Sequence, residues 1–166
     1  MGKLPKSITR SAAFSTCERY CYALGRHWDT SKGYALFIML NPSTADCLQD
    51  DPTIRRCMNF AHSWGYGGIE VCNLFDWRAT KPEQLRKSMA FAVSDKNDAA
   101  MRCRLIDARI VIAAWGNVPW AEERIEQVFH TAFSCGDRWD CLGLTKHGYP
   151  RHPLYVPAST KPTLFW

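Results

Sequence analysis

The stretch FIMLNPSTAD, residues 37–46, joins an apolar run to an Asn-Pro pair that is followed by small polar residues. The apolar run starts at Tyr34 and ends at Leu40, which is typical of a β-strand that is covered on both faces. Asn41, Pro42 and Ser43 follow directly. A buried strand therefore delivers polar side chains at its carboxyl end, and we ask what they are for.

Helical patterns and apolar runs alternate along the rest of the chain. Asp51-Pro52 predicts a helix start, because an acidic side chain can cap the first turn and proline suits its first position. Further helices are expected at 82–91, 95–107 and 119–133, and further strands at 69–75, 109–115 and 139–144. The aromatic-rich segment 12–30 predicts an antiparallel hairpin.

Apolar strands that are separated by helices indicate a mainly parallel sheet with helices on both faces. We therefore expect an α/β fold, a three-layer αβα arrangement with a mainly parallel four-stranded central sheet and an N-terminal antiparallel hairpin. No internal repeat or linker is visible, so residues 1–166 are expected to form a single domain.

Composition narrows the class of protein. Hydrophobic residues make up 46% of the chain, which argues for a packed globular protein, and no apolar stretch reaches the ~18 residues of a membrane span. The first residues lack the apolar core of a signal peptide, so we expect a cytoplasmic protein with no membrane partner. A net charge of +5 is compatible with a polyanionic partner.

The eight cysteines do not form a recognisable ligand pattern. Cys17 and Cys21 are separated by three residues, and no second pair has comparable spacing. Cys57 and Cys72 stand where a small buried hydrophobe would serve, so we expect reduced core thiols. We predict neither a metal nor a cofactor, and a structural metal or iron–sulfur cluster is the alternative.

Polar residues follow each of the four predicted strands. In chain order the clusters are Asn41-Pro42-Ser43-Thr44, Asn73 with Asp76 and Arg78, Trp115-Gly116-Asn117, and Lys146-His147 leading to Arg151-His152-Pro153. Each cluster alone could be a turn or a cap. In a parallel sheet, however, all four ends meet at one edge, where α/β folds bind ligands. The convergence predicts a binding or catalytic site.

Two common chemistries do not fit these residues. Gly65 to Gly68 precede a strand instead of a helix, which is the wrong order for a dinucleotide-binding loop. The chain has no G-x-S-x-G nucleophile elbow. Amide groups and a histidine remain, and such groups suit recognition of a base edge and stabilisation of a departing anion.

Several long motifs resemble the bacterial and phage family catalogued as domain of unknown function 1643. They are MLNPSTAD (39–46), DDPTIRR (50–56), NLFDWRAT (73–80), AAWG (113–116) and LGLTKHGYPRHPLY (142–155). The same blocks resemble, more distantly, the uracil-DNA glycosylase superfamily. That resemblance implies a uracil-DNA glycosylase-like fold, with Asn41 positioning the hydrolytic water, Asn73 reading the base edge and His152 stabilising the leaving base anion.

The chain departs from the glycosylase pattern at two single residues and in one short segment. Met39 replaces the glycine that usually opens the first motif, and residues 154–157 replace a serine-rich segment that grips DNA. Both changes argue against the way in which that superfamily holds double-stranded DNA. Ser43 stands where the uracil-specific branch carries a bulky tyrosine that screens 5-substituted bases, which implies a roomier pocket.

We therefore expect an N-glycosidase that hydrolyses the bond between a base and its sugar in DNA, including single-stranded DNA, or in a nucleotide. The alternatives are a non-catalytic binder of a base, nucleotide or modified DNA, and a small-molecule transferase or hydrolase. We expect a monomer. The catalytic candidates are Asn41, His152 and Asp46, with Asp50 and Asp51 as further water activators. The base-binding candidates are Ser43, Asn73, Phe75 and Trp77, and the phosphate-binding candidates are Arg55, Arg56, Arg78 and Arg151.

Overall fold

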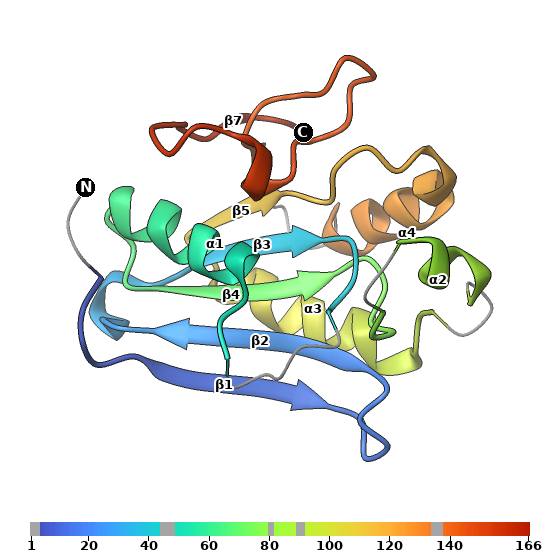
Figure 1. The fold of residues 1–166 in the computed structure, drawn as a ribbon, viewed down its shortest axis with the longest axis horizontal. Coiled ribbons are helices and arrows are strands. Elements are labelled where there is room, and N and C mark those ends of the chain that lie inside the picture. The colour runs from blue at the N-terminus through green and yellow to red at the C-terminus, as the bar shows by residue number, and fades with distance from the viewer. Residues whose placement is uncertain (1–3, 44–48, 80–81, 89–91, 134–137) are drawn as a thin grey trace.

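A computed structural model describes the chain apart from residues 1–3, 44–48, 80–81, 89–91 and 134–137 (Figure 1). The described strands are β1 (Thr9–Phe14), β2 (Cys21–His27), β3 (Ala35–Met39), β4 (Gly68–Asn73), β5 (Ile110–Ala113), β6 (Trp139–Cys141) and β7 (Thr163–Leu164). The α-helices are α1 (Pro52–Ser63), α2 (Pro82–Lys87), α3 (Asp95–Asp107) and α4 (Glu122–Phe133). The short 3₁₀ helices of the described residues are η1 (Thr30–Lys32), η3 (Pro119–Ala121) and η4 (Pro153–Tyr155).

The described strands form one seven-stranded mixed sheet in the order β1-β2-β4-β3-β5-β6-β7. Its centre is the parallel set β4-β3-β5-β6, and β2 joins the hairpin to β4 in the antiparallel sense. The predicted four parallel strands and the N-terminal hairpin are thus confirmed. The antiparallel strand β7 beside β6 was not predicted, because two residues carry no periodic signal.

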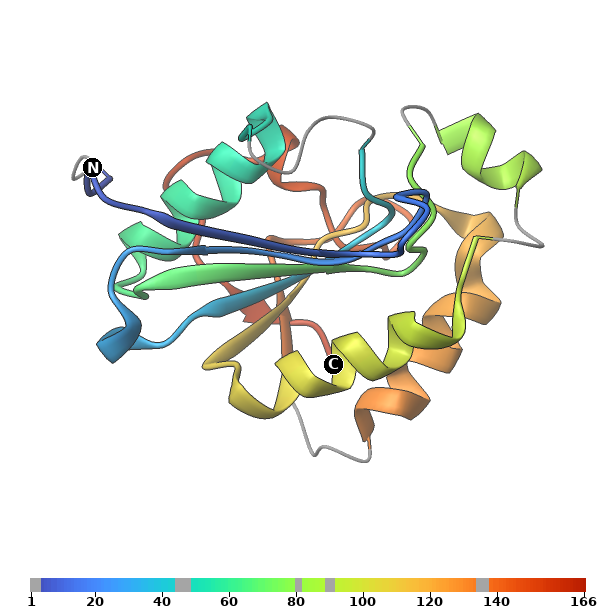
Figure 2. The same cartoon turned by 90° about the horizontal axis from the view of Figure 1, so that it is seen from below.

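Helices cover both faces of the sheet. Figure 2 shows α1 on one face and both α3 and α4 on the other. Side chains alternate between the faces along each strand. Phe37 therefore packs in the core under α1, whereas Leu36 and Ile38 pack in the core with α3 and α4. The two cores hold the central strands between them and leave only the strand ends open.

The order of the strands creates a crevice at the carboxyl edge. The chain leaves β3 for α1 on one face, and it leaves the neighbouring strand β5 for α4 on the other face. The two connections diverge, and such a switch point is where open α/β sheets bind ligands. The fold therefore places a candidate binding site beyond β3 and β5.

Helix α1 begins as its sequence predicts. The side chain of Asp51 accepts a hydrogen bond of 2.8 Å from the backbone N–H of Ile54, and Pro52 occupies the first position of the helix. Ile54, Cys57 and Ala61 then turn their side chains into the core. Across the residues that the structure describes, no helix has the length and apolar character needed to span a membrane.

Candidate functional site

A cavity of about 460 Å³ opens at the carboxyl ends of β3, β4 and β5. Its volume falls within the ~300–1,000 Å³ of typical small-molecule sites. The described lining includes six of the candidate site residues predicted from the sequence: Asn41, Ser43, Asp51, Asn73, Arg78 and His152. These positions come from all parts of the chain, and the parallel topology brings them to one edge.

Asn73 is the most unusual of these residues. It ends β4, it is 5% exposed, and its backbone carbonyl accepts a hydrogen bond from Nδ2 of Asn97 at 3.1 Å. Its side-chain amide, by contrast, has no hydrogen-bond partner within the described part of the chain. The polar atoms of this amide are not among the fully buried unpaired atoms of the described residues, so they are accessible from the cavity that Asn73 lines. The amide can therefore pair with a group that enters the cavity.

Asn41 is held by the chain segment that follows β4. Its Nδ2 donates to the carbonyl oxygens of Ala79, at 2.8 Å, and of Pro42, at 3.0 Å. Two carbonyl acceptors around one atom identify that atom as the nitrogen of the amide. Oδ1 is therefore the remaining polar atom of Asn41, and it can accept a hydrogen bond in the cavity that Asn41 lines.

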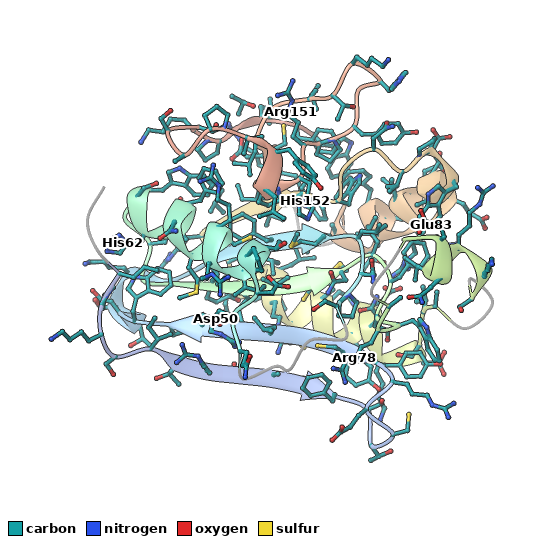
Figure 3. All side chains as sticks on the ribbon, in the orientation of Figure 1. Asp50, His62, Arg78, Glu83, Arg151 and His152 are labelled. Atoms are coloured by element: carbon teal, nitrogen blue, oxygen red, sulfur yellow. The ribbon has the colours of Figure 1, made fainter. Side chains whose placement is uncertain are left out.

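His152 is positioned by two neighbouring elements. Gly116, which follows β5 with φ of 83°, donates its N–H to the carbonyl oxygen of Pro150 at 3.0 Å. Arg56 of α1 donates to the carbonyl oxygens of Pro153, at 3.3 Å, and Val156. The segment that carries His152 is thus fixed on both sides, and Figure 3 shows His152 across the site from Asp50 and Arg78.

The protonation of His152 follows from its surroundings. The backbone N–H of Leu154 donates to Nδ1 of His152 at 3.4 Å, so in the neutral ring the proton resides on Nε2. Burial lowers the pKa of His152 below its ordinary value, and the nearby Asp51 carboxylate opposes this shift without reversing it. At neutral pH His152 therefore presents a neutral ring with an Nε2–H donor.

Asp51 is the one carboxylate in the described lining of the cavity. Its Oδ1 caps α1, and its Oδ2 lies 3.5 Å from the hydroxyl of Ser43. Asp46 lies outside the described residues. Asp50 does not line the cavity, and forms ion pairs with Arg26 at 2.6 Å and Arg10 at 3.0 Å. Among the candidate carboxylates that are described, Asp51 alone faces the cavity.

Only one of the four predicted phosphate-binding arginines lines the cavity. Arg78 donates to the carbonyl oxygens of Glu18, at 2.9 Å, and Ser43, at 3.5 Å, and thus bridges the hairpin turn and the segment after β3. Arg56 holds the His152 segment instead. Arg55 donates to the carbonyl oxygen of Asp50, and Arg151 donates to that of Leu144 at 3.0 Å.

The two aromatic base-binding candidates do not line the cavity. Phe75 is 2% exposed and stacks on Trp120, with 5.7 Å between ring centroids. Trp77 packs edge-on against Tyr20 at 5.3 Å. Neither lines the cavity, because each packs against another aromatic ring of the fold.

Some lining residues were not among the predicted site residues. Asn117 belongs to the polar cluster after β5, so its sequence neighbourhood did carry a signal. Phe14, Cys21 and Leu24 of the hairpin carried none, since they reach the site through antiparallel pairing of β2 with β4. Within the described residues, no group of three or more His, Cys, Asp or Glu side chains is placed to hold a metal ion.

Comparison with models of known protein families yields a match over most of the chain. The family described as "Protein of unknown function (DUF1643)" matches residues 21–154. No curated protein and no solved structure matches the chain. The matched segment includes Asn41, Asp51, Asn73 and His152, and therefore most of the cavity. The chain belongs to the family of proteins of unknown function DUF1643.

Proposed function

We propose that this protein is an N-glycosidase that hydrolyses the bond between a base and its sugar in DNA or in a nucleotide. The observation that carries the proposal is the unpaired amide of Asn73, 5% exposed and facing a cavity that Asn41 and His152 also line. An amide offers one donor and one acceptor side by side, which complements the edge of a nucleobase.

The architecture supports the same reading. Residues 39–42, at the end of the first parallel strand, and the Arg151-His152-Pro153 motif resemble the uracil-DNA glycosylase superfamily, and helices on both faces of a parallel sheet agree with a three-layer uracil-DNA glycosylase-like fold. The resemblance would give Asn41, Asn73 and His152 the roles of water positioning, base reading and anion stabilisation.

The chemistry follows from the groups in the cavity. The bond between C1′ of the sugar and the base nitrogen breaks, and its electron pair leaves with the base as an anion. Nε2–H of His152 would donate a hydrogen bond to that anion as its charge develops. A neutral donor suits this task because the site does not have to bury a separate cation before substrate binds.

Water then completes the reaction at C1′. Oδ1 of Asn41 would accept a hydrogen bond from the attacking water and so fix its position. The water oxygen bonds to C1′, and one of its protons passes to the carboxylate of Asp51, from which it returns to solvent or to the base anion. The products are a free base and a sugar with a hydroxyl at C1′. No cofactor takes part in this scheme.

The partner would be a nucleic acid or a nucleotide, bound by a monomer. Arg78 is the cation of the described lining and could contact a phosphate at the rim. Arg55, Arg56 and Arg151 do not line the cavity, which favours a small or single-stranded substrate over a long duplex footprint.

The test is release of free base. Purified protein is incubated with a panel of nucleotides and single-stranded and double-stranded oligonucleotides that carry normal and modified bases, and released base is measured by mass spectrometry. Asn73→Leu keeps the shape of the side chain and removes its hydrogen bonds. Because the amide has no partner among the residues that the structure describes, this variant should stay as stable as the wild type and lose about 10²–10³-fold in rate.

Matched variants separate catalysis from folding. His152→Ala should lose a similar factor, whereas His147→Ala, which changes an exposed histidine outside the cavity, should retain the wild-type rate. Unchanged rates in Asn73→Leu and His152→Ala would refute the assigned roles. Failure of the wild type to release any base from the panel would refute the glycosidase activity.

A non-catalytic binder is the second candidate. The observation that favours it is that both oxygens of Asp51 already have protein partners, the N–H of Ile54 and the hydroxyl of Ser43. Binding of a nucleotide or oligonucleotide that depends on Asn73, without release of base, would establish this alternative.

A further inference from the structure

The cavity has an apolar end that the proposed chemistry does not use. Phe14, Cys21 and Leu24 of the hairpin line it together with Val71 of β4, and we name these four residues the hairpin subsite. Leu24 and Val71 are directly paired across β2 and β4, so their side chains emerge side by side on one face of the sheet.

The hairpin subsite adjoins the amide of Asn73. Val71 and Asn73 are two residues apart on β4 and therefore point to the same face, about 7 Å from each other along the strand. Ile54 of α1, which is 8% exposed, adds a further apolar side chain to the lining. A group attached to a base at Asn73 would thus need only a few atoms to reach apolar surface.

The phenyl ring of Phe14 packs against a side chain that is itself hydrogen-bonded to the hairpin turn. The guanidinium of Arg78 lies 5.3 Å from its centroid, and the same guanidinium donates to the carbonyl oxygen of Glu18. An anchored ring loses little freedom when a ligand packs against it. The hairpin subsite is therefore a preformed apolar surface and not a loose hydrophobic patch.

Resting on the proposed function, we infer that the substrate base carries an apolar substituent that the hairpin subsite holds, so that Phe14, Leu24 and Val71 determine specificity. Asn73 pairs with the edge of the base, and the substituent extends from the base over β4 toward β2. Water in this end of the cavity has few polar partners, so an alkyl group displaces it favourably. A cationic substituent would lose its hydration without compensation, because the charged group beside Phe14 is the guanidinium of Arg78.

Binding of matched ligands tests this directly. The probes are 2′-deoxyuridine, thymidine and 5-(1-propynyl)-2′-deoxyuridine, each as a free nucleoside and within a single-stranded oligonucleotide, titrated by calorimetry. A methyl group in a fitting apolar pocket is worth about tenfold or more. We expect affinity to rise by about tenfold from deoxyuridine to thymidine and to rise again for the propynyl analogue. Equal or falling affinity along the series overturns the inference.

A large side chain within the hairpin subsite should abolish the preference for nucleosides with an apolar substituent. Leu24→Trp places a large ring in the hairpin subsite, and should bring the thymidine and propynyl affinities down to the level of deoxyuridine. Ala12→Trp is the control, because Ala12 pairs with Leu24 on the same face but is exposed and does not line the cavity. If thermal melting shows that Leu24→Trp does not fold, Leu24→Asn makes the same surface polar and should likewise reduce the preference to about twofold or less. A preference that survives a folded variant overturns the inference.

The two proposals fail in different ways. Binding that is lost in Asn73→Leu but does not depend on the substituent refutes the role of the hairpin subsite and leaves the glycosidase proposal intact. Absence of binding to every nucleoside and oligonucleotide refutes both.

Discussion

The side-chain amide of Asn41 donates a hydrogen bond of 2.8 Å to the backbone carbonyl of Ala79, which ties the segment after β3 to the segment after β4. The N–H of Ala79 returns a bond of 3.1 Å to the carbonyl of Pro42. Two strands that are neighbours in the sheet thus remain joined beyond their ends. The rim of the cavity is built by this pair of contacts, and Asn41 is part of the architecture as well as of the proposed chemistry.

We expect Asn41→Asp to destabilise the protein. The substitution replaces an N–H₂ group that faces two carbonyl oxygens with a carboxylate oxygen, which accepts and cannot donate. The expected loss is about 1–3 kcal/mol in the free energy of unfolding, measured by urea denaturation at pH 7. Asn117→Asp is the control at an exposed lining position and should stay within about 0.5 kcal/mol of the wild type. Equal stability of the two variants would show that the Asn41 bonds contribute nothing.

His152 should make stability depend on pH. Its pKa in the folded protein lies below the ordinary value of 6.5, so below pH 6.5 the unfolded chain binds more protons at this residue than the folded chain. The stability that this difference supports is complete above pH 6.5 and is lost as the pH falls through the folded pKa. Protonation would also place a second N–H opposite the N–H of Leu154.

His152→Asn isolates this effect, because an amide oxygen can still accept from Leu154 but does not titrate. Melting temperatures measured from pH 7.5 to pH 5 should fall more steeply for the wild type than for the variant. Parallel curves would mean that His152 has the same pKa in both states.

We expect Asp50 to contribute more to the free energy of unfolding than Arg10, because Asp50 also pairs with the buried Arg26. The Arg26 side chain is 0% exposed and its Nε lies 2.6 Å from Asp50, whereas Arg10 is 38% exposed. Asp50→Ala removes the carboxylate that lies 2.6 Å from the buried Arg26, and removal of one partner of a buried pair typically costs about 3–5 kcal/mol. Arg10→Ala removes an exposed partner and should cost about 0–1 kcal/mol. Denaturant unfolding of both variants checks the ranking, and similar losses would contradict it.

The same pair predicts sensitivity to acid. Burial alone would raise the pKa of Asp50, but hydrogen bonds from Arg26 and Arg10 outweigh burial and lower the pKa below its ordinary value of 3.8. The stability gained from this lowered pKa is therefore present above pH 3.8 and is lost as the pH falls through the folded pKa. Asp50→Ala should lack this part of the acid transition.

Local patterns predicted most of the fold. The Asp51-Pro52 start of α1 is confirmed down to the capping bond, since a cap depends on residues only three positions apart. The apolar runs predicted the parallel strands because burial on both faces leaves a continuous signal. Strand β7 was not predicted, because Thr163 and Leu164 are exposed and pair with residues more than twenty positions away.

The sequence predicted the site residues that the order of the strands alone brings together. It did not predict the contacts that depend on the direction of individual side chains. Asn41, Asn73 and His152 follow strands or motifs at one sheet edge, and the structure gathers them. Arg56 looks like any surface arginine in sequence, yet it binds carbonyls about a hundred positions away. Phe75 likewise follows β4 beside Asn73, but its ring turns to Trp120.

Ser43 should control the size of the base that is accepted. It is exposed, lines the cavity and lies 3.5 Å from Asp51, so the side chain at this position borders the bound base in the proposed complex. Ser43→Tyr adds a ring to that border, and added bulk in a packed site costs about 1–3 kcal/mol. We expect kcat/KM for thymidine and 5-(1-propynyl)-2′-deoxyuridine to fall by about 10–100-fold, with little change for 2′-deoxyuridine.

Ser43→Ala removes only the hydroxyl and should leave the ratio between these substrates unchanged, which separates steric exclusion from a lost hydrogen bond. A uniform fall for all three substrates in Ser43→Tyr would assign Ser43 to general support of the site, because a steric gate must discriminate between a hydrogen and an alkyl group.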